Sequence, residues 1–470
     1  MDDTKIKTAA DELRETLCYQ PENAAAALPE EEVAAADAYC EEYKRFLDAA
    51  KTEREATAEA VAMAEKAGFV PFTPGMALAP GDKIYCNNRG KALLLAVIGS
   101  RPITDGVTIA AAHIDSPRLD LKPNPLYEDA ELAYFDTHYY GGIKKYQWTA
   151  IPLALHGVVA RKDGSLVTVN IGEEDADPVF CVTDLLPHLG NEQMKRPAAE
   201  VVRGEDLNLL IGSRPFRGDK GSEAVKLNIL RLLSEKYAIT ETDFLSAELE
   251  IVPAFKARDL GLDRSMIGAY GHDDRVCAYP AVTALLACGT PGYTAVTILA
   301  DKEEIGSVGN TGMQAAFLRY FIDDLAASFG AKGHHVLSRS VCLSADVNAA
   351  FDPIYPEVLV RSNAAKLNYG VCITKYTGAR GKSSTNDASA EYLGQIRAIL
   401  DEAGVPWQIG EMGKVDAGGG GTVAMYIANL DVDTVDMGVP VLSMHAPFEV
   451  VSKIDVYAAH RAFLATMLRK

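Results

Sequence analysis

Residues 293–307, YTAVTILADKEEIGS, join an apolar run to a cluster of charged residues. The first half is rich in Thr, Val and Ile, which favour a buried strand. The adjacent glutamates Glu303 and Glu304 follow closely after it. Because neighbouring side chains at the end of a strand point in different directions, we expect these two carboxylates to have different roles.

Strand-like and helix-like segments alternate on both sides of this stretch. Residues 2–68 are rich in Ala, Glu and Lys, with apolar residues at helical spacing. Such alternation is typical of an α/β fold, in which helices cover both faces of a central sheet. The other predicted segments are helices at 278–289, 315–330, 388–404 and 453–470, and strands at 81–100, 106–117, 293–304, 334–348, 406–413 and 432–447.

Residues 118–256 differ from the rest of the chain. They contain short alternating strands, frequent Gly, Pro and Asp turns, and one helix-like patch at 222–238. A chain of 470 residues is also longer than an ordinary single domain. We therefore expect residues 1–117 and 257–470 to form one domain, and residues 118–256 to form an inserted β-rich domain.

Composition narrows the function classes. Hydrophobic residues make up 48% and charged residues 24% of the chain, as in ordinary globular proteins. A formal charge of −19 argues against a general nucleic-acid binder or a protein of anionic membranes. The acidic N-terminus does not show the basic start and continuous apolar core of a secretory signal, and we expect no apolar run to span a bilayer. Eight scattered cysteines without a C-x-x-C pair fit a reducing compartment, so we expect a cytoplasmic protein.

Potential metal ligands follow several of the predicted strands. In open α/β sheets, functional side chains gather at the carboxyl ends of strands. A single His or Asp at such a position is usually a turn residue, but the repetition at five places favours a common site. The residues are His113, Asp115, Asp273, Asp274, Glu303, Glu304, Asp346 and His445.

These residue types favour a pair of divalent cations. Four or more carboxylates that converged without a cation would resist ionising together. Carboxylate oxygen and imidazole nitrogen, without thiolate, suit catalytic Zn²⁺, and Mn²⁺ or Co²⁺ could substitute. Two metals about 3.5–4 Å apart would acidify a shared water molecule. A free carboxylate beside that water would take its proton, which gives the two adjacent glutamates separate roles.

The same residues resemble a known family. The order and spacing are similar to five signatures of the M18 metalloaminopeptidases, the aspartyl aminopeptidase family, over nearly the whole chain. GHDDRV (271–276) and the four glycines at 418–421 resemble its bacterial branch. The resemblance implies a mixed central sheet of the dizinc aminopeptidase type and an inserted dimerisation domain. The signatures are His113-Ile114-Asp115, Asp273-Asp274-Arg275, Asp301-Lys302-Glu303-Glu304-Ile305-Gly306, Ser344-Ala345-Asp346 and Ser443-Met444-His445.

The resemblance also implies a ligand set for two zinc ions per subunit. Asp273 would bridge the two ions. His113 and Asp346 would complete the coordination of one ion, and Glu304 and His445 that of the other.

Two further catalytic-site roles come from the resemblance. Glu303 matches the family's general base, and Asp115 matches the carboxylate that orients a ligand imidazole. The peptide bond between Asp273 and Asp274 would be cis, which is costly for a residue other than proline.

Self-association is implied as well. The inserted domain would pair subunits and send a histidine into the neighbouring active site to stabilise the oxyanion. Residues 180–193, FCVTDLLPHLGNEQ, resemble that element and nominate His188, although a plain turn histidine is the alternative. The family assembles as a hollow tetrahedral dodecamer, which would restrict substrates to peptides that are able to enter it.

Two loops are candidate substrate contacts. Residues 374–389 place Lys375, Arg380 and Lys382 near a strand end, where a cation could meet a substrate carboxylate. Gly419 and Gly420 lie in the run of four glycines, where the backbone could approach a ligand closely. A solvated charged loop and a flexible turn are the respective alternatives. The family's namesake substrates have acidic N-terminal residues, and neutral or apolar ones stay open.

Three other interpretations of these motifs compete with this one. The glycine-rich segments 306–312 and 418–421 suggest phosphate loops, but neither G-x-G-x-x-G nor G-x-x-x-x-G-K-[ST] occurs there. A dinuclear carboxypeptidase or deacylase of the M20 type would share the ligands and the glutamate pair. A scaffold with a decayed site is disfavoured, because every expected ligand is present. The sequence therefore favours a metal-dependent aminopeptidase that removes N-terminal residues from peptides.

Overall fold

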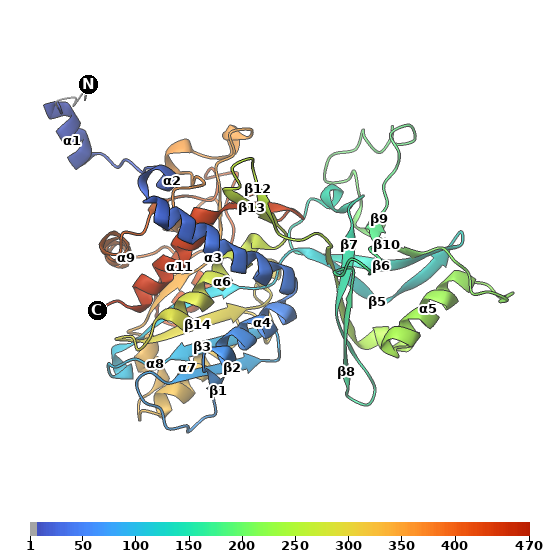
Figure 1. Ribbon diagram of the computed structural model, residues 1–470, viewed down its shortest axis with the longest axis horizontal. Helices are drawn as coiled ribbons and strands as arrows, with labels where there is room; N and C mark the ends of the chain where they lie inside the picture. Colours follow the sequence, from blue (N-terminus) through green and yellow to red (C-terminus); the bar gives the residue numbers. More distant parts are fainter. Residues whose placement is uncertain (1–6) are drawn as a thin grey trace.

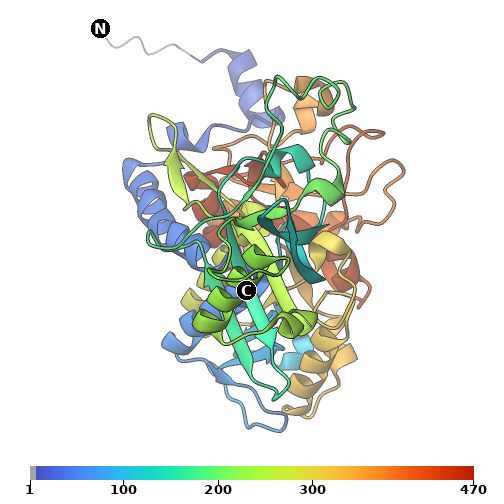
Figure 2. The same cartoon turned by 90° about the vertical axis from the view of Figure 1, so that its right-hand side faces the viewer.

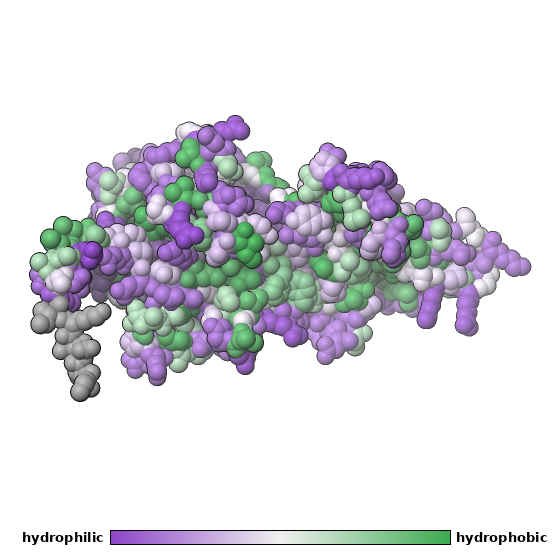
Figure 3. Space-filling view, turned by 90° about the horizontal axis from the view of Figure 1, so that it is seen from above, coloured by the Kyte–Doolittle hydropathy of each residue, from purple (hydrophilic) through white to green (hydrophobic). Residues whose placement is uncertain are grey.

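A computed structural model of the chain describes residues 7–470, which form two lobes (Figure 1). One lobe is built on a nine-stranded sheet and the other on a seven-stranded sheet. Figure 3 shows that the molecule is elongated along the direction that joins the lobes, with hydrophobic residues exposed on both.

The nine-stranded sheet is mixed, as the family resemblance implied. β14, β4, β15 and β19 run parallel to their neighbours in the centre, while β3 and β17 pair antiparallel with this group. In sheet order the strands are β1 (Val70–Pro71), β2 (Lys83–Asn88), β3 (Ala92–Val97), β14 (Thr294–Ala300), β4 (Val107–His113), β15 (Val341–Ser344), β19 (Asp433–Gly438), β17 (Val371–Thr374) and β18 (Trp407–Ile409).

Helices cover both faces of this sheet, which confirms the predicted fold class. Alternate residues of β14 belong to different hydrophobic clusters: Leu299 packs in one, and Val296 and Ile298 in the other. Helices on the first face are α3 (Glu30–Ala49), α4 (Glu53–Lys66), α6 (His272–Ala287), α9 (Ala390–Glu402) and α11 (Lys453–Met467); on the second are α7 (Phe317–Ala327), α8 (Gly333–Leu337) and α10 (Ala424–Ala428). The short helices α1 (Ala9–Leu17) and α2 (Ala24–Ala27) precede them.

The second lobe is an antiparallel sheet with one helix, α5 (Ala224–Tyr237), packed on it (Figure 2). A small third sheet contains β12 (Arg258–Leu260), β13 (Met266–Ala269), β21 (Glu449–Ser452), β20 (Pro440–Leu442) and β16 (Asn348–Ala349). The strands of the second lobe, in sheet order, are β8 (Leu166–Ile171), β7 (Leu153–Ala160), β11 (Ala247–Pro253), β5 (Arg118–Asp129), β6 (Leu132–Tyr140), β10 (Leu209–Gly212) and β9 (Cys181–Val182).

A buried ionic cluster joins the two lobes. Lys51 Nζ lies 2.6 Å from Glu173 Oε1, and the imidazole of His156 on β7 contacts both Glu173 (3.1 Å) and Glu55 (2.7 Å). Burial alone would lower the pKa of His156, but the facing carboxylates of Glu173 and Glu55 raise it above its ordinary value. The charges thus neutralise one another where the helical N-terminal segment meets the second lobe.

Two predicted strands differ from the structure. The segment 334–348 is only partly a strand, because residues up to Leu337 form α8, whose Val336 and Leu337 pack into the second hydrophobic cluster. The segment 432–447 divides between β19 and β20, which belong to different sheets. Gly438 ends β19, and a Cβ there would lie 1.8 Å from the carbonyl oxygen of Asp346. The first residues of the predicted N-terminal helical segment, 2–6, lie outside the described residues.

Candidate metal centre

Neighbouring strands deliver the candidate ligands to one edge of the central sheet. β4 ends at His113, β14 ends three residues before Glu303, and β15 ends two residues before Asp346. These three strands run parallel in register, so their carboxyl ends lie at the same edge. Glu303 and Glu304 stand on a single 3₁₀ turn, Glu303–Ile305.

Two further candidate ligands arrive from outside the sheet. Asp273 lies at the start of α6, where its backbone departs from helical geometry. Its peptide bond to Asp274 is cis, which confirms that expectation. His445 follows β20 and has a positive φ of 66°.

The carboxylate of Asp273 lies between two imidazoles. Its Oδ1 is 3.1 Å from Nε2 of His113, and its Oδ2 is 3.1 Å from Nε2 of His445. Oε2 of Glu304 lies 3.6 Å from the same nitrogen of His445. Asp346 joins His113 and Asp273 in one group whose ligand atoms are all within 4.8 Å of one another.

Hydrogen bonds fix which nitrogen of each imidazole faces Asp273. Nδ1 of His113 contacts the backbone carbonyl of Asp115 (3.1 Å), and Nδ1 of His445 contacts the carbonyl of Gly142 (2.8 Å). A carbonyl can only accept, so each Nδ1 carries the proton and donates it. Burial opposes charging of the two imidazoles, but the facing carboxylates raise the pKa of both, so that without a cation each Nε2 donates to Asp273. A cation would replace that proton between the Nε2 lone pair and the carboxylate oxygen.

The surrounding carboxylates strengthen the case for a cation. Burial and the charge of Asp273 raise the pKa of Glu304 far above its ordinary value. Burial and the charge of Asp274 do the same to Asp346. Oε1 of Glu304 is buried and has no hydrogen-bond partner among residues 7–470. Oxygen and nitrogen donors without thiolate match the preferences of zinc in catalytic sites, so the residues present fit this metal.

The two glutamates differ in exposure. The side chain of Glu304 is 3% exposed and that of Glu303 is 17% exposed. Oε2 of Glu303 lies 4.0 Å from Nε2 of His113, and burial, with the charges of Asp115 and Asp273, raises the pKa of Glu303 to about 7. Glu303 thus lies at the open side of the cluster.

Asp115 contacts both His113 and the turn that carries Glu303 and Glu304. Its side chain is fully buried and accepts hydrogen bonds from the backbone N–H groups of Glu303 and Glu304, both at 3.1 Å. Its Oδ1 also lies 3.3 Å from Nδ1 of His113. Asp115 therefore links the first imidazole to the glutamate turn.

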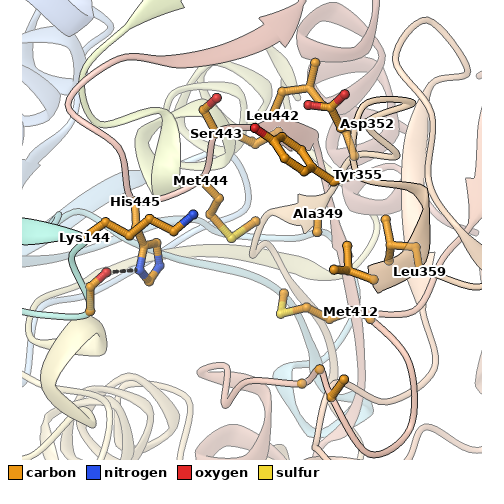
Figure 4. A pocket seen from close by; sticks show the side chains of 18 of the residues that line it. Lys144, Ala349, Asp352, Tyr355, Leu359, Met412, Leu442, Ser443, Met444 and His445 are labelled. Carbon is orange, nitrogen blue, oxygen red and sulfur yellow. Dashed lines mark hydrogen bonds between the residues drawn. The ribbon is translucent and has the colours of Figure 1, made fainter. Parts of the chain in front are cut away.

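A cavity of about 580 Å³ opens beside His445. Figure 4 shows Met412, Met444, Leu442, Tyr355 and Leu359 around it, with the side chain of Lys144 pointing into it. Most of the lining is apolar, Lys144 and Asp352 being among its charged members. The cavity is large enough for the side chain of a bound peptide residue.

The three residues predicted from the sequence to contact the substrate do not all line the same cavity. Gly419 lines this cavity, and Gly420 follows it with its N–H bonded to the carbonyl of Thr377. Lys375 forms an ion pair with Asp387 and lines a separate cavity of about 410 Å³. The roles of these three residues as substrate contacts stay predictions.

His188 lies outside the cluster within one subunit. It is exposed on the loop that follows β9, in the seven-stranded lobe. None of the metal-binding groups formed by residues 7–470 includes it. A role in catalysis therefore depends on a neighbouring subunit.

Sequence reasoning missed four residues around the site. Tyr140 contacts Asp115, and Gly142 contacts His445. Glu449 accepts hydrogen bonds from the backbone N–H groups of Asp273 (3.1 Å) and His445 (2.7 Å). The fourth is Lys144. The charged Glu449 at the start of an apolar strand, EVVS, is an available signal, whereas YYGGIKK (139–145) contains no pattern that indicates a site.

Comparison with protein families agrees with this geometry. Residues 46–466 match the family model described as Aminopeptidase I zinc metalloprotease (M18). The chain belongs to the M18 family. It is therefore a metal-dependent aminopeptidase, and the phosphate-binding, M20-type and scaffold interpretations are set aside.

Individual relatives support the assignment. This M18 chain is 51% identical over 431 residues to the probable M18 family aminopeptidase 1 of Clostridium acetobutylicum, covering 90% of this chain and 93% of that one. The crystal structure of an M18 aminopeptidase from Thermotoga maritima superimposes with a TM-score of 0.91 at 46% identity, over 96% of this chain and 99% of that chain. The S. cerevisiae mApe1 dodecamer shares the fold, with a TM-score of 0.74 at 19% identity over 90% and 95% of the two chains.

The described part of this M18 chain, residues 7–470, contains no helix long and apolar enough to cross a membrane.

Proposed function

We propose that this aminopeptidase holds two zinc ions per subunit, one on each side of Asp273. The observation that carries the proposal is that the two oxygens of Asp273 face two different imidazole nitrogens, each at 3.1 Å. His113 and Asp346 would complete one site, and Glu304 and His445 the other. By ligand type, Mn²⁺ or Co²⁺ could substitute.

Glu303 is the proposed general base of peptide hydrolysis. Bound zinc would polarise the peptide carbonyl and acidify a water molecule. Glu303 would accept the proton of that water and pass it to the amine that leaves. Its greater exposure, 17% against 3% for Glu304, supports this order within the pair. Asp115 would keep His113 oriented by contacting its Nδ1.

The cavity beside His445 is the proposed binding site for the N-terminal residue of the substrate. An acidic residue there is the preference that the family resemblance implies, and Lys144 supports it, because an ammonium group can bind a carboxylate. A second candidate is a neutral apolar residue, which the lining by Met412, Met444 and Leu442 favours.

Residues 118–256 are the proposed dimerisation domain, and His188 is proposed to act in the neighbouring subunit. Four large apolar side chains near His188 are exposed: Leu185 (53%), Leu186 (49%), Leu189 (71%) and Met194 (62%). Such a group supports contact with another protein surface. Assembly of dimers into a tetrahedral dodecamer is proposed by analogy with the mApe1 dodecamer. A cytoplasmic location stays a prediction from the cysteine pattern.

The glutamate assignment predicts opposite effects of two matched substitutions. Glu303→Gln should keep two zinc ions per subunit and lower kcat by about 10²- to 10⁴-fold, because it removes the base alone. Glu304→Gln should lose about one zinc ion per subunit, because it removes a ligand. Zinc analysis and hydrolysis of aminoacyl anilides give both values. Full activity of Glu303→Gln would contradict the base, and the reverse zinc pattern would exchange the two roles.

The role of Lys144 predicts a selective loss. Lys144→Met should lower kcat/KM for substrates with N-terminal Asp or Glu by about 10- to 100-fold, the value of one charge-assisted hydrogen bond. Substrates with N-terminal Leu or Met should be unaffected. Lys145→Met is the matched control, since Lys145 is the next residue and does not line the cavity. Unchanged values for acidic substrates would favour the second candidate.

The proposed action of His188 across subunits predicts complementation. His188→Ala and Glu303→Gln should each be nearly inactive alone. A 1:1 mixture of the two variants should recover roughly a quarter of wild-type activity. About half of its randomly formed dimers contain one copy of each variant, and each of these mixed dimers has one intact site out of two. The measurement is activity after co-refolding or co-expression of the two variants. No recovery in assemblies shown to be mixed would contradict the proposal.

A further inference from the structure

Three consecutive residues of the seven-stranded lobe reach both sides of the metal centre. Tyr140 ends β6, and Gly141 and Gly142 follow it. Tyr140 contacts Asp115, which in turn contacts His113. Gly141 lies beside Glu304, and Gly142 contacts His445. These residues belong to the second lobe in sequence and to the metal centre in space.

Tyr140 acts on the His113 side. Its hydroxyl donates a hydrogen bond of 2.8 Å to Oδ2 of Asp115. The same carboxylate touches Nδ1 of His113 through its other oxygen, at 3.3 Å. Tyr140 is only 9% exposed, so water cannot readily replace its hydroxyl.

Other contacts hold the Tyr140 ring in place. The guanidinium carbon of Arg118 lies 3.9 Å from the ring centroid, and Arg118 is itself 7% exposed. Arg118 Nε lies 2.8 Å from Asp120 and 3.2 Å from Glu250, both of which belong to the second lobe. Arg118 therefore limits the movement of the Tyr140 ring, and the Tyr140 hydroxyl donates to Asp115 from a defined position.

Gly142 and Gly141 lie next to the other two candidate ligands, His445 and Glu304. The carbonyl of Gly142 accepts the Nδ1 proton of His445 at 2.8 Å (dashed line in Figure 4). A Cβ on Gly141 would lie 3.3 Å from both Cβ and Oε2 of Glu304, and Gly141 has a φ of +76°. The backbone therefore passes too close to Glu304 for a side chain there to fit without displacement.

We propose that Tyr140–Gly142 is a positioning segment for the metal centre, which orients His113 through Asp115, His445 directly and Glu304 by backbone contact. The inserted sheet would then be a structural part of the two-zinc site as well as an interface for other subunits. This inference rests on the proposed two-zinc function. It assigns no catalytic contact to the three residues.

Tyr140→Phe tests the first half of the segment, because it removes one oxygen and keeps the ring over Arg118. Zinc affinity, measured by competition with a chelator of known Kd, should weaken by about 10- to 100-fold. With zinc in excess, kcat should fall while KM is unchanged, since no substrate contact is lost. The absorption spectrum of the Co²⁺-loaded protein should shift as the ligand geometry changes. Tyr139→Phe is the control, because Tyr139 precedes it on the same strand and is 41% exposed.

Gly141→Ala tests the second half. The added methyl group should displace Glu304 and weaken zinc binding, with a reduced zinc content at limiting zinc. Gly164→Ala is the matched control for backbone strain, because Gly164 has a φ of +84° and no atom lies within 4 Å of the added Cβ. Gly164→Ala should leave zinc affinity at the wild-type value.

The outcomes separate this inference from the proposed function. Weaker zinc binding in Tyr140→Phe and Gly141→Ala, with both controls normal, supports the positioning segment. Wild-type zinc affinity and kcat in both variants would overturn it and leave the two-zinc function standing. Wild-type protein that binds no zinc would overturn both.

Discussion

The buried carboxylate of Asp273, placed between two imidazoles, is the interaction on which the rest of the site depends. A carboxylate that is 3% exposed is costly unless charged or hydrogen-bonded partners surround it. Here burial opposes ionisation, but His113 and His445 hold the pKa of Asp273 well below its ordinary value. For Glu304 and Asp346 the nearby imidazoles do not outweigh burial and the neighbouring carboxylates, so the pKa values of both are raised, and divalent cations would allow these groups to ionise together.

The two lobes contribute to this site in different ways. The nine-stranded sheet brings His113, Glu304 and Asp346 to one edge by parallel strand pairing. The second lobe contributes hydrogen bonds to Asp115 and His445 through the end of β6. The ionic cluster of Lys51, Glu173 and His156 fixes the lobes to each other, and so helps to keep those hydrogen bonds aligned.

The sequence predicted the parts of this structure that depend on local pattern. Apolar runs such as 294–300 indicated strands, and the polar residues that follow them indicated an edge of the sheet where ligands could meet. The M18 resemblance indicated the cis peptide bond at Asp273, which the structure has.

Contacts between distant segments could not be predicted in this way. Tyr140 meets Asp115 because β5 and β6 form a hairpin whose register brings their ends together. Gly142 and His445 are 303 positions apart in the chain, and their contact follows from the docking of the two lobes. Lys144 likewise reaches the cavity only through that docking, whereas Lys375, which the local pattern favoured, pairs with Asp387.

The most direct test of the two-zinc site is a crystal structure of the zinc-loaded protein with anomalous diffraction recorded at the zinc absorption edge. A site with two zinc ions would give two peaks per subunit, one beside each oxygen of the Asp273 carboxylate, about 3.5–4 Å apart. A single peak on one side of Asp273, or peaks away from His113 and His445, would contradict it.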